Sequence, residues 1–389
     1  MLHAARERPP TKEEAQMSKP KRGQNQGSNY QLADGTWRGA ISLGSGHRKY
    51  FSGRTKRSVE TQLSRAKYEH DQGLPTRNDR ITVGQFLDRW LAEIARPKVR
   101  PLTFQRYESL IRVHVKPFLG TVPLTKLDPD MLQRHFNQCV SRGSSPQSVA
   151  HLRAVMRSAL NHALRCGYVG RNVAALTQRP HIPEAEVTIL SPVQAREFLS
   201  AVEADRLGVL YGLALLTGMR QGELLGLRWE DVDLDAGTVE VRYAMQLQDG
   251  EYRLVEPKTK RSRRKNVLPQ VAIGLLSRHR TLQATERLKA GSRWHDNDLV
   301  FTTRLGTPLD GRNATRHLRK ILRDSGLPEM RFQDLRHSAA SLLHALGVPL
   351  RVAMEILGHS QMSTTLRVYT HVMDESRREA ALAMNSVFA

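Results

Sequence analysis

The sequence predicts a multidomain α+β protein: a small three-stranded sheet plus helix, a four-helix domain, and a mainly α domain with a small antiparallel sheet. The chain has 389 residues, more than one typical domain, and 39% of them are hydrophobic, which is enough for separate cores. Hydrophobic spacing alternates near the N-terminus and follows a helical period further on. Two polar stretches, at 73–80 and 178–188, interrupt these patterns and are typical of linkers.

The N-terminal segment begins with a polar stretch and continues as a compact pattern. Residues 1–27 are rich in Lys and Pro and are expected to form a disordered basic leader. Alternating patterns at 29–32, 36–43 and 49–52 predict three short strands, and 58–72 predicts a helix. The expected core residues are Val59, Leu63 and Ala66 on one helix face, with Trp37, Tyr50 and Phe51 from the strands.

Four amphipathic helices are predicted in the next segment, at 82–95, 103–114, 128–141 and 146–166. Each has apolar residues spaced to form one buried face, so together they predict an all-helical domain. A small polar residue precedes three of the four helices, where its side chain can accept a backbone hydrogen bond. These predicted N-caps are Thr82, Thr103 and Asp128.

The chain is strongly basic, with a net charge of +22 and a pI near 10.5, which indicates a polyanionic partner. Residues 1–180 hold 31 Lys and Arg against 13 Asp and Glu, whereas 181–389 hold 29 against 25. The first 180 residues are therefore expected to contribute most of the DNA contacts. Arg153, Arg157 and Arg165 are expected to form an exposed basic face. For any one of them, a solvated charge is the alternative.

Several protein classes are disfavoured by composition. Cys139 and Cys166 are the only cysteines, and both lie in helical patterns, so neither a disulfide framework nor a cysteine zinc site is expected. No apolar run approaches the ~18 residues of a membrane span, and residues 1–24 lack the apolar core of a secretion signal. A cytoplasmic protein without membrane partners is expected.

The third segment starts at Leu190-Ser191-Pro192, an N-cap followed by proline at the first helical position. Helices are predicted at 192–204 and 206–217, and the remainder after the strands is mostly helical. Strand patterns occur at 237–246, 252–255 and 265–268.

Four sparse motifs follow one another in this third segment. Their residue types suit metal-free transfer of a phosphodiester onto a protein hydroxyl, because a tyrosine can attack while cations hold the phosphate oxygens. Guanidinium groups serve best, since they are planar, bidentate and permanently charged. No carboxylate cluster for two metal ions and no P-loop is evident. The motifs are TGMRQGELLGLRW with Arg220, EPKTKRSRRKNVLP with Lys258, FQDLRHSAASLLHALGV with Arg336, and ILGHSQMSTTLRVYTHV with His359 and Tyr369.

Taken in this order, the motifs resemble the catalytic domain of tyrosine recombinases, the phage integrase family. The resemblance covers about 190–372, and the two preceding segments are similar to the arm-binding and core-binding domains of some integrases. It implies an arm-type DNA-binding domain at 28–75, a helical core-type domain at 76–180, and a catalytic domain at 181–389. For 28–75, a small structural extension is the alternative.

The same resemblance implies a site-specific recombinase that integrates and excises a phage or mobile element through a 3′-phosphotyrosyl intermediate, without metal, ATP or another cofactor. The expected partners are double-stranded attachment-site DNA and three further copies of the chain, forming a tetramer in the nucleoid of a bacterial host. A directionality factor or a host DNA-bending protein is left open. The alternatives are a type IB topoisomerase and a DNA-binding regulator without catalysis.

The resemblance also implies a role for each motif residue. Tyr369 would attack the phosphate, while His359 would donate a hydrogen bond to a phosphate oxygen. Arg220 and Arg336 would hold the non-bridging oxygens. Lys258, after the strand at 252–255 and before that at 265–268, would lie on a hairpin and act as general acid. Within the basic run that follows, Lys260 is the alternative general acid. For any one cation of this run, simple contact with phosphates is the alternative to a catalytic role.

One position departs from the family pattern, which usually reads His-x-x-Arg-His. Here Gln333 occupies the first place, and its amide can hydrogen-bond a phosphate or a tyrosine hydroxyl but cannot accept a proton. His337 is expected to be structural, because it points about 100° away from Arg336 on a helix. Glu223 shares a helical face with Arg220 and could orient it.

Overall fold

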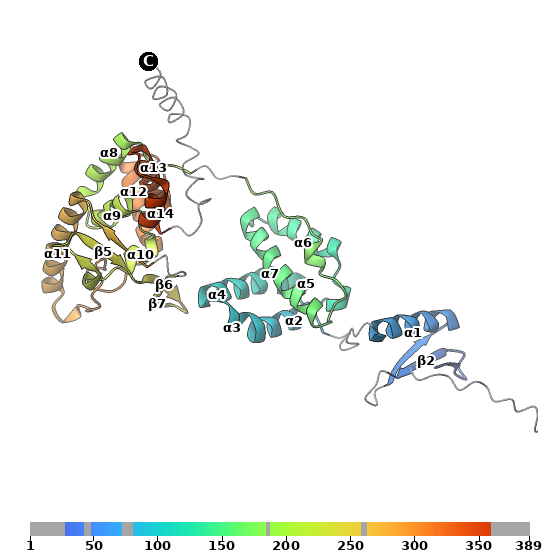
Figure 1. Cartoon of the computed structure of the whole chain (residues 1–389). Coiled ribbons are helices and arrows are strands. Elements are labelled where there is room, and N and C mark those ends of the chain that lie inside the picture. Colours follow the sequence, from blue (N-terminus) through green and yellow to red (C-terminus); the bar gives the residue numbers. More distant parts are fainter. Residues whose placement is uncertain (1–27, 43–47, 72–80, 184–186, 258–262, 359–389) are drawn as a thin grey trace, which may run out of the picture. The chain divides into compact units, whose positions relative to one another are not determined.

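The computed structural model describes residues 28–42, 48–71, 81–183, 187–257 and 263–358 (Figure 1). The chain divides into two compact units, Met1–Pro183 and Glu184–Ala389, and each is described by itself. The predicted leader at 1–27 and linker at 73–80 lie outside the described residues. Within the described ranges, no helix has the length and apolar character needed to cross a membrane.

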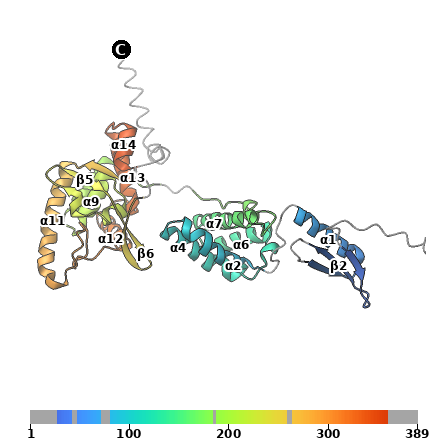
Figure 2. The same cartoon turned by 60° about the horizontal axis from the view of Figure 1, so that its bottom comes forward.

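The N-terminal sheet contains three antiparallel strands in the order β1-β2-β3. In register, Tyr30 is paired with Arg38 and Ala40 with Tyr50. Figure 2 shows helix α1 lying along one face of this sheet, and no helix within the described part of 28–71 covers the other face. The elements are β1 (Ser28–Gln31), β2 (Trp37–Ser42), β3 (Arg48–Gly53) and α1 (Lys56–Asp71).

Helix α1 approaches β2 very closely at Gly39. A Cβ atom at this position would lie 2.5 Å from Cγ1 of Val59 and 2.7 Å from Cδ1 of Leu63, so only glycine fits without displacement. The predicted apolar face of the helix is confirmed, because Val59 and Ala66 are buried, as is Ile41 of β2. This close contact forms the small core between the N-terminal sheet and α1.

The prediction that Tyr50 belongs to this core is wrong. Its side chain is 53% exposed, whereas the adjacent Phe51 is half-buried. Successive residues of a strand point to opposite faces, so Tyr50 and Phe51 cannot both face α1. Tyr50 therefore lies on the helix-free face, where the Arg38 guanidinium stacks over its ring at 5.3 Å.

The second segment is all-helical, as predicted, and two of its helices contain a π-helical turn. The N-caps Thr82 and Asp128 are confirmed by hydrogen bonds to the backbone N–H groups of Gln85 and Met131. The predicted cap at Thr103 is wrong, because the helix begins earlier, at a proline. The helices are α2 (Val83–Trp90), α3 (Arg96–Lys98), α4 (Pro101–Leu110), α5 (Lys116–Leu119), α6 (Pro129–Ser141) and α7 (Pro146–Arg165), with π turns at Leu91–Ala95 and Ile111–Val115.

The expected basic face of α7 is only partly formed. Arg157 and Arg165 are exposed, but Arg153 is half-buried. Its Nη2 donates to the carbonyl of Thr177 at 2.6 Å, and its Nε donates to the Thr177 hydroxyl at 3.0 Å. Arg153 therefore fastens α7 to the chain that follows it, which corrects its assignment to the exposed face.

The second unit is mainly helical, with a three-stranded antiparallel sheet in the order β4-β5-β8 and a separate two-stranded ribbon, β6-β7. The predicted cap at Ser191 is confirmed as a capping box with Gln194. The helices are α8 (Pro192–Glu203), α9 (Gly208–Thr217), α10 (Gln221–Leu225), α11 (Gln270–Ala290), α12 (Gly311–Asp324), α13 (Phe332–Ala345) and α14 (Leu350–Leu357). The strands are β4 (Val232–Asp233), β5 (Thr238–Val241), β6 (Ala244–Gln248), β7 (Glu251–Val255) and β8 (Arg264–Val267).

Two strand predictions are corrected by this topology. The predicted strand at 237–246 is split into β5 and β6, which belong to different sheets. The strands on either side of Lys258 are β7 and β8, and they also belong to different sheets, so the predicted hairpin between them is wrong. Alternation within a strand indicates two faces but does not identify the partner strand.

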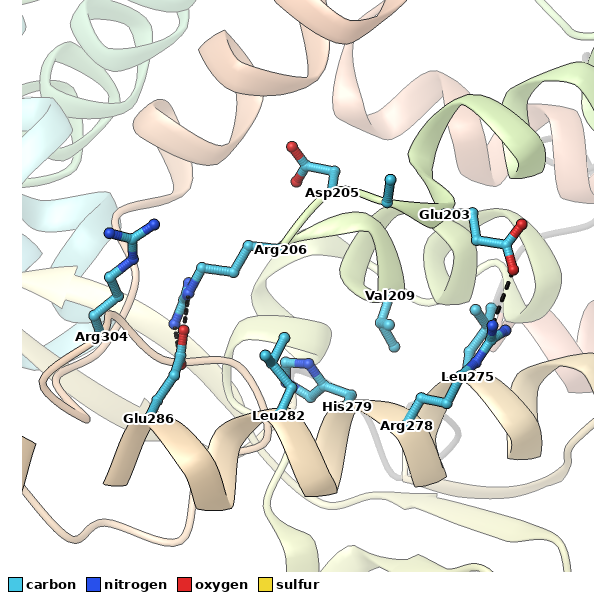
Figure 3. A pocket seen from close by; sticks show the side chains of 11 residues that line it. Glu203, Asp205, Arg206, Val209, Leu275, Arg278, His279, Leu282, Glu286 and Arg304 are labelled. Atoms are coloured by element: carbon cyan, nitrogen blue, oxygen red, sulfur yellow. Dashed lines mark hydrogen bonds and ion pairs between the residues drawn. The ribbon is translucent and has the colours of Figure 1, made fainter. Parts of the chain in front are cut away.

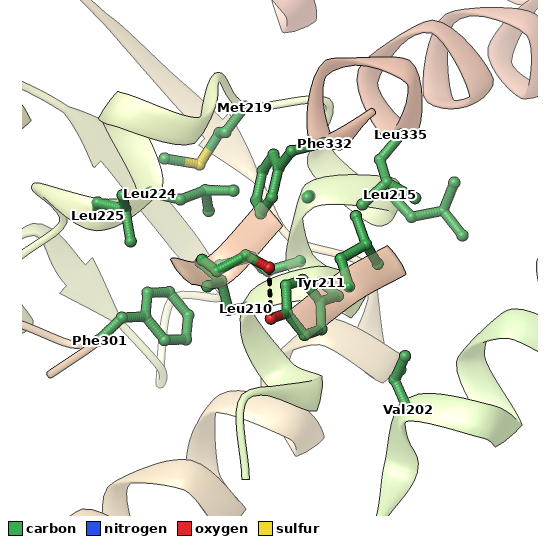
Figure 4. Packing of buried hydrophobic residues seen from close by; sticks show 14 of the residues in the cluster. Val202, Leu210, Tyr211, Leu215, Met219, Leu224, Leu225, Phe301, Phe332 and Leu335 are labelled. Carbon is green, nitrogen blue, oxygen red and sulfur yellow. Dashed lines mark hydrogen bonds between the residues drawn. The ribbon is translucent and has the colours of Figure 1, made fainter. Parts of the chain in front are cut away.

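Helix α9 lies at the centre of the hydrophobic core of the second unit (Figure 4). It is apolar on all sides, and Leu210, Tyr211 and Leu213 are fully buried. The Tyr211 hydroxyl donates to the carbonyl of Ala314 in α12 at 3.0 Å, which satisfies the one polar group of this buried ring. Phe332 of α13 packs edge-on against Tyr211. The predicted α+β class is confirmed.

A substitution at Gly39 tests the close packing of α1. Gly39→Val should lower local stability by about 1–3 kcal/mol through overpacking, although valine favours strands. Hydrogen exchange of the β2 and α1 amides in the full chain should accelerate. Ala40→Val, on the other face of β2, is the control and should leave that exchange unchanged. Equal protection in the two variants would contradict this packing.

Candidate active site

Arg220 is positioned by a sharp break between α9 and α10. Gly218 closes α9 with φ +61°, and a Cβ there would lie 2.3 Å from Cδ2 of Leu357 in α14. Both the left-handed backbone and the contact with α14 require glycine. The chain then turns so that Arg220 becomes the N-cap residue of α10. The predicted end of α9 at 217 is thus confirmed.

The expected contact between Arg220 and Glu223 forms. Nη1 of Arg220 donates to Oε1 of Glu223 at 2.7 Å, and the Arg220 backbone N–H donates to Oε2 at 3.0 Å. Nη2 of Arg220 donates to the carbonyl of Gly358 at 3.0 Å. Hydrogen bonds to Glu223 and to Gly358 hold this guanidinium in two directions, yet 37% of the side chain stays exposed.

Arg264 is a member of the site that sequence reasoning missed. The first residue of β8, it was visible only as one cation in a basic run. Its side chain is 6% exposed, and Nη2 donates to Oε2 of Glu223 at 2.9 Å. Nε donates to the carbonyl of Ile356 at 2.8 Å, and the Asn266 amide donates to the same carbonyl at 3.0 Å. Nothing in the sequence distinguishes Arg264 from its basic neighbours, because its acceptors belong to α10 and α14.

Arg336 lies deep in the domain, on helix α13. The residue is 2% exposed, and Nη1 donates to the carbonyl of Gly218 at 2.7 Å. Nη2 is buried and has no hydrogen-bond partner within the described part of the chain. Leaving such a donor unpaired costs about 1–3 kcal/mol, so an incoming anion would be stabilised here.

The charges of the cluster are unbalanced. Arg220, Arg264 and Arg336 surround the carboxylate of Glu223, which leaves an excess of two positive charges. Burial, with repulsion from Arg220 and Arg264, lowers the pKa of Arg336 to about 9, against the attraction of Glu223. At neutral pH the guanidinium is therefore still charged. An anion that bears up to two negative charges, such as a phosphate undergoing substitution, would complement the cluster.

Glu223 is ionised in spite of its burial. Burial by itself raises the pKa of this carboxyl, but Arg264 and Arg220 outweigh burial and bring the pKa below its ordinary value of 4.5. The anion is held by three hydrogen bonds from two arginines. It is therefore the fixed negative centre around which the cations are arranged.

Helix α13 carries Gln333 and Arg336 three residues apart, which places them on neighbouring positions of one face. Gln333 is exposed in the first turn. The buried Asp334 secures this turn through a bidentate pair with Arg331, at 2.9 and 3.0 Å. His337 is half-buried, and burial lowers the pKa of its imidazole. The neutral ring agrees with the structural role expected of it.

The structure therefore brings together Arg220 and Arg336, and places Gln333 on the helix that carries Arg336. Lys258, with its alternative Lys260, and both His359 and Tyr369 lie outside the described residues. Among the tyrosines described in the second unit, Tyr211 and Tyr252 are harder to ionise than a free tyrosine. Burial raises the pKa of Tyr211, and burial plus a hydrogen bond to Asp310 raises that of Tyr252.

A separate cavity of about 320 Å³ lies between α11 and the start of α9 (Figure 3). Its charged side chains are largely paired with one another. Arg206 binds Glu286 through two hydrogen bonds, at 2.5 and 2.7 Å, and Arg278 binds Glu203 at 2.9 Å. Arg220, Gln333 and Arg336, the motif residues that the structure describes, do not line it, so it is separate from the arginine cluster.

The low pKa of Glu223 predicts a pH dependence. A lowered folded-state pKa contributes stability above the unfolded value, and this contribution is lost as the pH falls through the folded value. The stability difference between wild type and Glu223→Gln should therefore be largest near pH 7 and shrink below 4.5. Urea unfolding across this pH range measures it, with the exposed Glu251→Gln as control. A difference independent of pH would contradict the assignment.

Comparisons with known proteins identify the family of the chain. The model of the phage integrase family matches residues 189–376, and that of the phage integrase N-terminal SAM-like domain matches 82–139. A XerC-like tyrosine recombinase of Caldanaerobacter subterraneus is 32% identical over 361 residues, which cover 88% of this chain and 92% of that protein.

Two solved structures share the fold. The Tn1549 transposon integrase in complex with transposon right end DNA has a TM-score of 0.66 at 20% identity, over 77% of this chain and 98% of that one. The lambda integrase tetramer bound to a Holliday junction has a TM-score of 0.56 at 20% identity, over 86% and 95%. With the sequence identity to the XerC-like recombinase extending over nearly the whole chain, this protein belongs to the phage integrase family of tyrosine recombinases.

Proposed function

We propose that this recombinase cuts and rejoins double-stranded DNA at attachment sites through a 3′-phosphotyrosyl intermediate at Tyr369, and that it integrates and excises a phage or another mobile element. The observation that carries the proposal is the cluster of three guanidinium groups near the buried carboxylate of Glu223, in which Nη2 of Arg336 lacks an acceptor among the described residues. A scissile phosphate would supply that acceptor.

Arg220 and Arg336 would bind the two non-bridging oxygens of the phosphate. Attack forms a bond between the Tyr369 oxygen and phosphorus and breaks the bond from phosphorus to the 5′-oxygen. Lys258 would protonate the departing 5′-oxygen, and His359 would donate to a phosphate oxygen. In the second step a 5′-hydroxyl attacks the phosphotyrosine and restores the tyrosine. One phosphodiester replaces another, so no external energy source is required.

Ionising the tyrosine is the main difficulty of the first step. Its ordinary pKa of ~10 makes the phenolate about 4 kcal/mol unfavourable at pH 7. The excess positive charge of the cluster stabilises both a phenolate and the developing charge on phosphate. Gln333, exposed on the same helix as Arg336, would orient the phosphate or the hydroxyl without accepting a proton.

Helix α12 carries a row of exposed cations that suits contact with the DNA backbone. Its apolar residues Ala314, Leu318 and Leu322 are buried, which turns the basic side outward. The spacing of the cations corresponds to one helical face. These exposed residues are Arg312, Arg316, Arg319, Lys320 and Arg323.

The N-terminal sheet would be the arm-type DNA-binding domain at 28–75. Its helix-free face carries the exposed side chains of Tyr30, Arg38, Arg48 and Tyr50, which combine charge with aromatic surface. The helical domain at 76–180 would bind the core site, and 181–389 would catalyse. The exposed Arg157 and Arg165 support the second of these assignments.

The assembly would be a homo-tetramer on two attachment sites, as in the lambda integrase tetramer on a Holliday junction. Strand exchange between two duplexes requires four cleavages, which four copies of one active site supply. We extend the proposal to a nucleoid-associated enzyme in the cytoplasm of a bacterial host. A directionality factor and a host DNA-bending protein are further proposed partners.

The covalent step can be tested with a nicked suicide substrate in EDTA. A 3′-phosphotyrosyl adduct should accumulate at Tyr369 without added metal, because the cations of the site are side chains. Tyr369→Phe should abolish the adduct and retain DNA binding, whereas Tyr211→Phe, a buried control, should still form it. Strict magnesium dependence or an adduct in the Tyr369 variant would overturn the mechanism. Supercoil relaxation without two sites would favour a topoisomerase.

The arm-domain assignment can be tested on the helix-free face of the sheet. Arg38→Gln should weaken binding to DNA from the ends of the element by roughly tenfold at fixed salt. Arg57→Gln, which removes the same charge from the exposed side of α1, should have a much smaller effect. Fluorescence anisotropy of the full-length protein provides the measurement. An equal loss of DNA affinity in both variants would indicate general charge attraction and would refute the helix-free face as the DNA-binding surface.

A further inference from the structure

We propose that Arg264 is a positioning residue of the recombination reaction: it fixes Glu223, and thereby Arg220, against the backbone turn that immediately precedes His359. The inference rests on the proposed function, because it concerns the geometry of the same active site. It assigns a distinct role to one member of the basic run at 260–265.

A closed ring of hydrogen bonds carries the proposal. Arg264 donates from Nη2 to Glu223 at 2.9 Å and from Nε to the Ile356 carbonyl at 2.8 Å. Glu223 accepts from Nη1 of Arg220 at 2.7 Å, and Nη2 of Arg220 returns to the Gly358 carbonyl at 3.0 Å. Each arginine thus joins the carboxylate to the end of α14. The ring fixes α10, β8 and α14 relative to one another.

Arginine is required at this position because the two acceptors lie in different directions. Its planar fork presents Nε and Nη2 at fixed angles, whereas an ammonium group is a single point with flexible reach. Burial strengthens the requirement, since the side chain is only 6% exposed. A Cβ at Gly358 would lie 2.9 Å from Nη1 of Arg264, so the guanidinium also packs closely against the turn.

The end of α14 depends on these donors. Ile356 and Gly358 lie in its last turn and C-cap, where backbone carbonyls have no partner within the helix. Arg264 and Asn266 satisfy the first of them, and Arg220 satisfies the second. Cations at a helix C-terminus also interact favourably with the helix dipole. His359 follows this turn directly in the sequence.

Arg264 differs from the two arginines proposed to bind phosphate. Arg220 is 37% exposed, and Arg336 has a buried Nη2 without a partner in the described residues. Arg264 is buried and directs two of its nitrogens at protein acceptors. It therefore acts through Glu223 and the α14 turn rather than on the substrate.

The test uses full-length protein, a suicide DNA substrate, single-turnover cleavage rates and DNA affinity. Arg264→Met should slow cleavage on the order of 100-fold, the cost of a small misplacement of catalytic groups, while DNA affinity changes little. Arg264→Lys, which keeps the charge but not the fork, should recover only part of the rate. Asn266→Ala removes one bond to Ile356 and should have a smaller effect than Arg264→Met.

The matched control is Arg206→Met, which breaks a half-buried pair with Glu286 away from the cluster. It should lower the thermal midpoint as Arg264→Met does and leave the cleavage rate near wild type. Arg264→Lys preserves a folded variant for measurement if Arg264→Met fails to fold. The Glu223→Gln/Arg264→Met double variant should cleave little more slowly than the slower single variant, because both break one ring.

A substrate with a methylphosphonate at the scissile position separates positioning from folding. This group lacks the negative charge that Arg220 would neutralise, so the defect of Arg264→Met should shrink at least tenfold relative to wild type. An equal defect on both substrates, or cleavage by Arg264→Met within about threefold of wild type, would overturn the inference. Wild-type protein is measured first, because its failure to form any adduct would refute the proposed function itself.

Discussion

The buried carboxylate of Glu223 is the contact on which the rest of the candidate site depends. It accepts from the side chain and backbone of Arg220 and from the side chain of Arg264. Removing one partner from such a buried network leaves the others charged and unpaired, which is far more costly than the net value of the bonds. The same anion sets the direction in which Arg220 points and the place where β8 meets α14.

The cluster combines a stability cost with a chemical use. Three guanidinium groups near one carboxylate repel one another, and burial adds to the cost for Arg336, whose pKa falls to about 9. A protein without an anionic ligand would be more stable with an apolar residue at that position. In the proposed function the strain is relieved by phosphate, most strongly when its charge grows during substitution. Binding energy is thereby directed to the transition state.

Local patterns predicted much of the architecture but not the partners of individual side chains. The N-caps predicted at Thr82, Asp128 and Ser191 are confirmed, because each cap depends on a hydrogen bond to a backbone N–H only three residues further on. The prediction for Tyr50 was wrong because its burial depends on which face of the sheet α1 covers. The prediction for Arg153 was wrong because its acceptor, Thr177, lies 24 residues away. Arg264 gave no distinct signal, since its partners belong to α10 and α14, distant in the sequence.

The sequence by itself determined the α+β class, the order of the segments and the family, because helix periods, strand alternation and ordered motifs are local or sparse features that need no contacts. It also predicted Arg220 and Arg336 as candidate phosphate-binding residues. Only the tertiary structure decided that these two arginines and Arg264 lie near the same carboxylate, that of Glu223. It also decided that the ends of α9 and α14, at Gly218 and Gly358, accept hydrogen bonds from this cluster. Such contacts are set by packing between elements far apart in the chain, and no periodicity encodes them.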